Sequence, residues 1–594
     1  MAVIPRQQQT PPQTIDRFLG LNQDTSGDTQ LQLGESPNMY NFRITENYKL
    51  RKRNGYRQLF ETLGAVDIQG MWYGSLGGTY HFLFAANGNV YKHDLALGTN
   101  TSVGTLIDAQ TYFFAYGGKV YMLNGHEYKS WDGTTFGDVV GYIPLIATST
   151  PPTGGGTPNE GLNVLTGKKR QTFSGDNTAT QYQIAETDLT SVDVVKVDGV
   201  VKTVTTDYTV NLVTGILTFL AAPPTGQDNV DIQWTKGAGQ REEVTGHKFA
   251  MFFGGQNDTR VFFYGNGSNR YVYTGLANGV PSAEYIPALN YREISSDEFA
   301  VTDIVRQYDR QIIYTNGGEA WYSYYDPITL ESGDVIADFP TFPLNQAKGN
   351  VAPGQSRLIN NNPFTIFKGV QEWVATNVRD ERNANYISKR VQPSLSALDL
   401  STALTVDWER RWEYWMAFGN VVYIYNYRLD VWYKFQLNDN VTCFMIADDQ
   451  LYFGTDSGKI MKFESGLKTD NETAISSYWE MGFFDFEAEW LQKFLNEMWI
   501  SLKPEYRSSL DITFQTDRVA LAKDFTAVYN MSVFDDTDFG DYSFLVNYNP
   551  QPFRFKIKAK KFVYFKLILS NEEINDTLTI LSINLAARYG SKSR

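Results

Sequence analysis

Residues 451–463 read LYFGTDSGKIMKF, and this stretch decides the fold class. An apolar run ends in the turn Asp456-Ser457-Gly458, and a second run that mixes apolar and polar residues follows. Asp, Ser and Gly are the residues that tight turns between antiparallel strands favour. The stretch therefore predicts a β-hairpin.

The same pattern recurs elsewhere in the chain. It is found in residues 82–94, 113–123 and 416–425, which turn at Asn87-Gly88-Asn89, Gly117-Gly118 and Gly419-Asn420. Hairpins that recur at intervals of roughly 30–60 residues are typical of propeller blades, because each blade must stack on its neighbours to bury both faces. We therefore predict a β-propeller, with a pair of β-sandwiches as the alternative.

Two parts of the chain depart from this pattern. A linker-like run, Pro151-Pro152-Thr153-Gly154-Gly155-Gly156, precedes short alternating strands at residues 192–197, 200–204, 208–210, 215–219 and 230–234. We interpret this part as an inserted β-module. After Gly466 the expected strands become longer, as a β-sandwich requires.

The predicted fold class is therefore all-β, a β-propeller with an inserted small β-module and a C-terminal β-sandwich. The expected parts are a flexible N-terminal arm (1–14), the first part of the propeller (15–150), the inserted module (151–240), the remainder of the propeller (241–466) and the C-terminal sandwich or platform (467–594). The arm is expected from its Gln, Thr and Pro content.

Composition limits the classes of function. The 594 residues include 52 Lys and Arg against 66 Asp and Glu, which gives a net charge of −14. Proteins that hold nucleic acid by neutralising phosphates need the opposite balance. An acidic surface suits DNA that slides past without sticking, but ordinary soluble proteins carry the same balance, so the charge alone does not decide between these functions. No run of 18 apolar residues occurs, so no membrane-spanning helix is expected. Residues 1–14 are polar and lack the apolar run that a signal peptide requires, so export by the standard route is not expected.

No residue pattern points to catalysis or to a cofactor. The four histidines, His81, His93, His126 and His247, have no partners at metal-ligand spacing, and Cys443 is the single cysteine. Glycosidases are the enzymatic rival because they also occur on propellers, and they need two carboxylates that flank one bond. Acidic residues are too numerous to choose such a pair. We therefore predict a protein that is not an enzyme, with no catalytic, cofactor-binding or metal-binding residues.

Two basic clusters are the candidate contact residues. The first surrounds the turn Asn54-Gly55-Tyr56 and consists of Lys49, Arg51, Lys52, Arg53 and Arg57. The second lies in residues 553–560, where Arg554, Lys556, Lys558 and Lys560 alternate with apolar residues, so that a strand would have one buried and one basic face. We expect both clusters to contact other subunits or proteins; a solvated face and DNA contact are the alternatives.

Several runs resemble one family of viral proteins. The opening runs are FLGLN (18–22), LGESPNM (33–39) and LRKRNGY (50–56). They are similar to the start of bacteriophage tail hub or nozzle proteins, also called packaged-DNA stabilisation proteins. Residues 251–262 (MFFGGQNDTRVF), 273–279 (YTGLANG), 281–285 (PSAEY), 306–313 (RQYDRQII) and 510–518 (LDITFQTDR) resemble the same family.

The resemblance implies a structural virion protein in the tail of a short-tailed phage. Such a subunit would form a ring with copies of itself, commonly six-fold, and would contact other tail proteins such as an adaptor, fibres or a needle. Double-stranded DNA would pass through the ring without specific binding, and the ring would help to retain packaged DNA. The alternative is a receptor-binding or baseplate protein that contacts the host surface through aromatic side chains such as Trp72, Tyr73 and Trp131.

Overall fold

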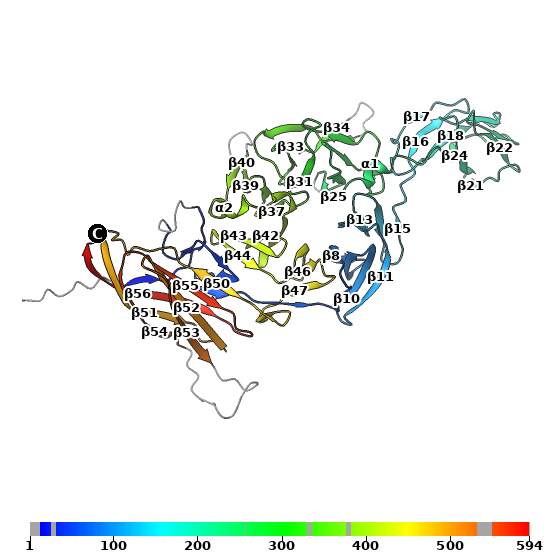
Figure 1. Cartoon of the computed structure of the whole chain (residues 1–594). Coiled ribbons are helices and arrows are strands. Elements are labelled where there is room, and N and C mark those ends of the chain that lie inside the picture. The colour runs from blue at the N-terminus through cyan, green and yellow to red at the C-terminus, as the bar shows by residue number, and fades with distance from the viewer. Residues whose placement is uncertain are drawn as a thin grey trace, which may run out of the picture. The chain divides into compact units, whose positions relative to one another are not determined.

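The computed structural model describes residues 12–24, 31–255, 257–329, 335–375, 382–505, 507–530 and 549–592. The chain divides into two compact units. The terminal unit comprises Met1–Ile68, Lys368–Val374 and Asn383–Arg594, and the middle unit comprises Gln69–Phe367 and Ala375–Arg382. Strands dominate both units (Figure 1). The predicted fold class is confirmed, because the chain is an all-β propeller with an inserted β-module and a C-terminal β-sandwich.

The middle unit contains four successive four-stranded antiparallel blades among its described residues. They are β8 (Ile68–Leu76), β9 (Thr79–Ala86), β10 (Asn89–Asp94) and β11 (Thr99–Thr105); β12 (Tyr112–Tyr116), β13 (Lys119–Leu123), β14 (Tyr128–Trp131) and β15 (Phe136–Asp138); β25 (Phe249–Phe253), β26 (Arg260–Tyr264), β27 (Arg270–Tyr273) and β30 (Tyr291–Glu293); and β31 (Val301–Gln307), β32 (Arg310–Thr315), β33 (Ala320–Tyr324) and β36 (Thr341–Asn345).

Shorter elements accompany these blades. They are α1 (Glu242–Thr245), β28 (Leu276–Ala277), β29 (Val280–Pro281), β34 (Asp326–Thr329) and β35 (Val335–Asp338). Strands β37 (Arg357–Ile359) and β38 (Asn362–Ile366) also belong to the middle unit. Most of β39 (Val370–Ala375) and of β40 (Arg382–Tyr386) belongs to the terminal unit.

The predicted hairpins are present at the positions that their turn residues indicated. Asn87 and Gly88 have φ angles of 50° and 67° and join Ala86 to Asn89 across a two-residue turn. Both central residues of this turn type need positive φ, which Asn and Gly adopt at little cost. Aromatic side chains from such strands, including Phe114, Tyr128 and Phe263, fill the core between the second and third blades.

The inserted module also lies in the middle unit and has its own core. One sheet contains β16 (Leu145–Thr150), β17 (Thr157–Pro158), β18 (Lys168–Gly175), β20 (Ser191–Val197), β21 (Val200–Val201) and β24 (Gly226–Thr235), and the other contains β19 (Gln181–Gln183), β22 (Tyr208–Asn211) and β23 (Ile216–Phe219). Phe173, Tyr182 and Trp234 are buried between them.

The predicted boundary of the module at 151–240 is inaccurate in two places. Strand β16 starts at Leu145 and pairs with β18, so the module sheet begins before the proline–glycine run. Val164 and Leu165 leave the module and pack in the core of the neighbouring blades. The proline–glycine run is the turn between β16 and β17. Its composition indicated an irregular segment but not which strands it connects.

The terminal unit contains two further blades. The first is β41 (Leu404–Trp408), β42 (Glu413–Phe418), β43 (Val421–Asn426) and β44 (Val431–Gln436), and the second is β45 (Val441–Ala447), β46 (Gln450–Thr455), β47 (Ile460–Phe463) and β7 (Tyr56–Gln58). Strands β48 (Thr469–Asp470) and β49 (Thr473–Ala474) extend the second blade. Short helices η2 (Lys389–Val391), α2 (Gln392–Leu395), η3 (Leu400–Thr402) and η4 (Glu409–Arg411) accompany them.

The sandwich of the terminal unit combines strands from both ends of the chain. Sheet A has the order β5 (Phe42–Ile44), β6 (Leu50–Lys52), β56 (Thr579–Lys592), β51 (Leu491–Leu502) and β54 (Gln551–Phe562), with β1 (Gln13–Ile15) on β56. Sheet C has the order β4 (Met39–Tyr40), β50 (Ser477–Glu480), β55 (Phe565–Asn571), β52 (Arg507–Thr516) and β53 (Val519–Asn530). Strands β2 (Gly20–Leu21) and β3 (Glu35–Ser36) form a separate pair.

The expected start of the propeller at residue 15 is therefore wrong. Strands β1 and β4 to β6 lie in the sandwich, and β7 is the first propeller strand. The expected arm also ends earlier than residue 14, since Gln13 and Thr14 already pair with Leu585 and Asn584. Residues 1–11 lie outside the described residues. The pairings of β1, β4 and β7, and that of β6 with β56, could not be read from the sequence because the partner strands are more than 400 residues away.

Candidate functional site: a basic sheet face

Strand β54 has the two faces that its sequence predicted. Phe555, Ile557 and Ala559 are buried, whereas the four predicted contact residues of this strand are exposed. These are Arg554, Lys556, Lys558 and Lys560. Strand β54 ends the hydrogen-bonded order of sheet A, so the cations follow the edge of that sheet. Charged side chains on an edge strand discourage unspecific strand pairing and leave a positive surface for an acidic partner.

One of these cations is neutralised within the sheet. Arg554 donates from Nε to Oε2 of Glu497 at 3.0 Å and forms a second ion pair through its other nitrogen. Hydrogen bonding from Arg554 lowers the pKa of Glu497. Both groups are on the surface, so the pair adds little to the free energy of unfolding and mainly orients the Arg554 side chain.

Two bulges interrupt the ladder between β54 and β51. The register shifts near Leu495 and near Lys493, and Lys558 and Lys561 have φ angles of 57° and 58°. A bulge inserts one unpaired residue and increases the local twist of an edge strand. The positive φ of Lys558 is therefore explained by the bulge, and its side chain remains exposed.

A depression of about 310 Å³ lies on the same sheet. Its lining comprises Pro12, Asn496, Glu497, Trp499, Ala586, Ala587 and Arg588. Trp499 is half-buried and Arg588 is exposed, so the lining combines an aromatic side chain with a cation close enough to Glu497 to help lower the pKa of its carboxyl. Neither residue was predicted from the sequence, although Trp499 alternates with the apolar residues Met498, Ile500 and Leu502 in β51, a pattern that indicates an outward-facing tryptophan.

The first basic cluster does not form one surface. Lys52 and Arg53 were expected at a tight turn, but both are buried with side-chain partners inside the terminal unit. The prediction that Lys52 and Arg53 contact another subunit or protein is therefore wrong, because both side chains are buried against residues of their own unit. Residues 50–52 and 56–58 belong to different sheets, so Asn54-Gly55 connects two sheets and is not a hairpin turn.

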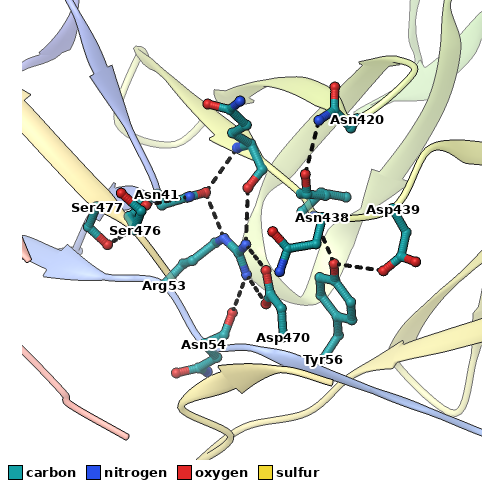
Figure 2. Close-up of polar contacts among 12 residues, drawn as sticks. Asn41, Arg53, Asn54, Tyr56, Asn420, Asn438, Asp439, Asp470, Ser476 and Ser477 are labelled. Atoms are coloured by element: carbon teal, nitrogen blue, oxygen red, sulfur yellow. Dashed lines mark hydrogen bonds and ion pairs between the residues drawn. The ribbon is translucent and has the colours of Figure 1, made fainter. Parts of the chain in front are cut away.

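Figure 2 shows the network around Arg53. Its guanidinium donates to Asn41 Oδ1 at 2.8 Å, to Asp470 Oδ1 at 2.7 Å and to the carbonyl oxygens of Asn54 at 3.1 Å and Gln436 at 3.3 Å. A second contact with Asp470 completes a bidentate ion pair. Both side chains are only 1% exposed, so the pair is fully enclosed. Burial raises the pKa of Asp470, and Arg53 opposes that shift.

Lys52 has equally local partners. Its ammonium donates to Asn571 Oδ1 and to the carbonyl oxygen of Glu573 at 3.2 Å. Burial lowers the pKa of Lys52 to about 8. The two contacts tie β6 to the last residue of β55 and to the segment that follows it.

The other three members of the first cluster are separate from one another. Lys49 donates to the carbonyl oxygen of Asp16 at 2.5 Å, and Arg57 pairs with Glu464 at 2.6 Å on the surface. Arg51 is half-buried in β6, opposite Arg43 and Thr579. The second cluster is therefore the better contact candidate.

The described residues contain no group of three or more His, Cys, Asp or Glu that could hold a metal ion. Among these residues the helices lack the length and apolar character needed to cross a lipid bilayer. Cys443 is buried, which raises its pKa to about 12, and burial lowers the pKa of His247 to about 4. Trp131 lies in a blade core and Trp72 packs against it.

No family model and no curated protein matches the chain. Among solved structures, it is similar to the computationally designed Ika8 protein (10% identity, TM-score 0.30, 68% of this chain and 99% of that chain). It is also similar to BamB from Moraxella catarrhalis (8%, 0.31, 68% and 98%) and to YCF48 from Cyanidioschyzon merolae (10%, 0.25, 69% and 98%).

Proposed function

We propose that the chain is a structural subunit of a ring-shaped nozzle or hub in the tail of a short-tailed bacteriophage. The observation that carries the proposal is the resemblance of the opening runs and of residues 251–262 and 306–313 to tail proteins of this class. The ring forms the DNA exit channel and helps to retain packaged DNA, and other tail proteins bind it. The subunit acts by assembly and not by catalysis.

The basic face of β54 supplies a contact that such an assembly can use. The whole chain has a net charge of −14, yet Lys556, Lys558 and Lys560 lie exposed on one strand. Rings form when one surface of a subunit binds a different surface of the next and the rotation closes. A basic strand edge on an acidic protein suits contacts of this kind, since acidic surfaces are plentiful on the next copy.

Neutralising this face tests the proposal. In Arg554→Ala/Lys556→Ala/Lys558→Ala, we expect fewer rings by native mass spectrometry and electron microscopy of the full chain, alone or with its tail partners. Each exposed ion pair between subunits contributes about 0–1 kcal/mol to assembly, so we expect the variant to assemble more weakly but not to lose assembly completely. The matched control is Lys168→Ala/Lys202→Ala/Lys236→Ala, which removes three positive charges from the inserted module.

DNA retention separates a subunit contact from a DNA contact. Normal rings in the β54 variant together with altered, less salt-dependent DNA retention would mean that these residues bind phosphates. A chain that stays monomeric with and without its partners would refute the ring itself.

A second candidate, a receptor-binding or baseplate protein, is favoured by one observation. The inserted module exposes apolar side chains, namely Val200, Val201, Val204, Val213 and Leu220. Exposed apolar patches mark interaction surfaces in many proteins. Images of purified virions distinguish the two, since a ring on the tail axis supports the nozzle and peripheral appendages support the receptor-binding protein.

A further inference from the structure

Four arginines line one pocket of about 110 Å³ in the terminal unit. Arg43 comes from β5, Arg410 and Arg411 from η4, and Arg428 from the connection between β43 and β44. The rest of the lining comprises Ile44, Glu46, Trp412, Asn426 and Leu429. One water molecule occupies roughly 30 Å³ in the liquid, so the pocket has room for a small polyatomic ion.

The residues that line this pocket carry more positive than negative charge. Arg43 pairs with Glu413 at 2.8 Å, and Arg428 lies 3.8 Å from Glu46. Within the lining itself, four guanidinium groups lie with one carboxylate, that of Glu46. Glu413 is already engaged, because it also accepts from the hydroxyl of Tyr433 at 2.7 Å and from the indole of Trp415 at 3.0 Å. Guanidinium groups do not lose their protons in proteins, so deprotonation cannot relieve the excess.

Several guanidinium donors at the pocket have no acceptor. Nε of Arg43 is buried without a hydrogen-bond partner. Within the described part of the chain, the side chains of Arg410 and Arg411 donate no hydrogen bond. Arg411 instead stacks over the ring of Trp408 at 4.4 Å, which leaves the N–H edges of its plane available. Burial and the neighbouring charge of Arg43 lower the pKa of Arg411, as expected for like charges held close together.

The turn that presents these side chains is fixed in place. Trp412 ends η4 with a φ of 54°, an angle that a bulky residue rarely adopts. Asn426 donates to the carbonyl oxygen of Arg411 at 3.3 Å, and the backbone of Tyr427 donates to that of Trp412 at 3.0 Å. Arg428 lies over the ring of Trp412 at 4.2 Å. The arginines therefore reach the pocket from a held turn and not from a free loop.

We propose that this pocket binds a phosphate group, with Arg43, Arg410 and Arg411 as its donors and Arg428 adding charge. An anion matches a lining of four arginines and one carboxylate. Guanidinium groups from three segments suit a tetrahedral oxyanion, whereas a single fork already satisfies a planar carboxylate. The phosphate belongs either to a free ion or to a nucleic-acid strand, which share this chemistry. The inference is independent of ring formation.

Calorimetric titration of the full chain with inorganic phosphate tests this site. Saturable binding is expected, and Arg410→Gln should weaken it by about tenfold or more, since a hydrogen bond to a charged group contributes roughly 1.5–3 kcal/mol. Arg410 is exposed, so this variant should fold normally; Arg411→Gln is the second variant. Arg554→Gln, an equal change of charge on β54, should bind phosphate like the wild type.

Two further titrations identify the source of the phosphate and the class of anion. A short single-stranded oligonucleotide that binds the wild type, competes with phosphate and fails to bind Arg410→Gln would assign a nucleic-acid phosphate, and absence of oligonucleotide binding alongside phosphate binding would assign the free ion. Acetate binding as tightly as phosphate would overturn the proposal. Equal phosphate binding by the wild type, Arg410→Gln and Arg411→Gln would also overturn it. Such a result would mean that the measured heat comes from a general effect of phosphate on the protein surface and not from this pocket.

Discussion

Arg53 and Asp470 form a charge pair that the sequence could not reveal. The two residues are 417 positions apart, and each was visible only as one charge in a polar context. Strand β6 alternates, however, with Leu50 and Lys52 buried and Arg51 half-buried. This alternation indicates that Lys52 lies on the buried face. The prediction did not use it, because five cations close together in the sequence indicated a single exposed surface.

Removing one partner of this pair should destabilise the terminal unit strongly. Arg53→Met leaves the Asp470 carboxylate buried and unpaired, which typically costs about 3–5 kcal/mol. Chemical denaturation should show a much smaller loss, about 0–1 kcal/mol, for Arg57→Met, whose pair with Glu464 is exposed. The double variant Arg53→Met/Asp470→Asn should recover part of the loss. Equal costs for Arg53→Met and Arg57→Met would contradict the assignment.

Asp303 provides a pH-dependent test in the middle unit. Its carboxylate accepts from the Tyr264 hydroxyl at 2.9 Å and from the backbone N–H of Ser356 at 2.7 Å. Burial nevertheless raises the pKa of Asp303 to about 6, and these hydrogen bonds oppose the shift only in part. Between pH 3.8, the pKa of an ordinary Asp in the unfolded chain, and about pH 6, Asp303 is therefore protonated in the folded state and ionised in the unfolded state.

The sign of the pH dependence follows from this raised pKa. The stabilising contribution of Asp303 is fully present below about pH 3.8 and is lost as the pH rises through about 6, by roughly 3 kcal/mol in total. Tyr264→Phe removes a donor to the charged form, so the loss should extend to higher pH. Unfolding free energies measured between pH 4 and 8 check this, with the exposed Asp309→Asn as control. An unchanged pH profile in Tyr264→Phe would argue against it.

At the scale of elements, β54 shows what a local pattern can establish. Its alternation of apolar and basic residues was sufficient to identify the buried and exposed faces, because side-chain direction in a strand depends on neighbouring positions alone. Its bulges and its place at the end of sheet A depend on β51 and were beyond that pattern.

The inserted module can be removed in a way that its structure specifies. The backbone N–H of Glu160 donates to the carbonyl oxygen of Leu145 at 3.0 Å, and that of Lys236 donates to the carbonyl oxygen of Gly167 at 3.0 Å. The two ends of each deleted segment are therefore next to each other in space. Deleting residues 146–159 and 168–235, with one glycine at each junction, keeps Val164 and Leu165 in the blade core. We expect the remaining chain to retain a cooperative unfolding transition by circular dichroism.

Deleting residues 153–240 as one block is the matched comparison. That deletion also removes Asn163, which donates to the carbonyl oxygens of Tyr142 and Glu284 at 2.8 and 2.9 Å, and the buried side chains of Val164 and Leu165. Truncating one buried leucine usually costs about 2–5 kcal/mol, so the block deletion should unfold at clearly lower temperature. Equal stability of the two deletions would show that residues 163–165 do not support the blades.

At the scale of the whole molecule, the all-β class and the three kinds of part were predictable, because turn residues and strand alternation are local signals. The assignment of strands to sheets was not. Residues 13–52 contribute β1 and β4 to β6 to the sandwich, and β7 completes the blade of β45 to β47. Short strands of two or three residues carry too little pattern to indicate a partner near the other end of the chain.

The position of β7 has a consequence for synthesis on the ribosome. Tyr56–Gln58 leaves the ribosome long before Ile460–Phe463, the strand it pairs with, and about 400 residues separate them. At roughly 5–20 residues per second, this interval lasts roughly 20–80 s. During this time β7 has no partner strand, so its edge is exposed to aggregation and to chaperones until β47 has been translated.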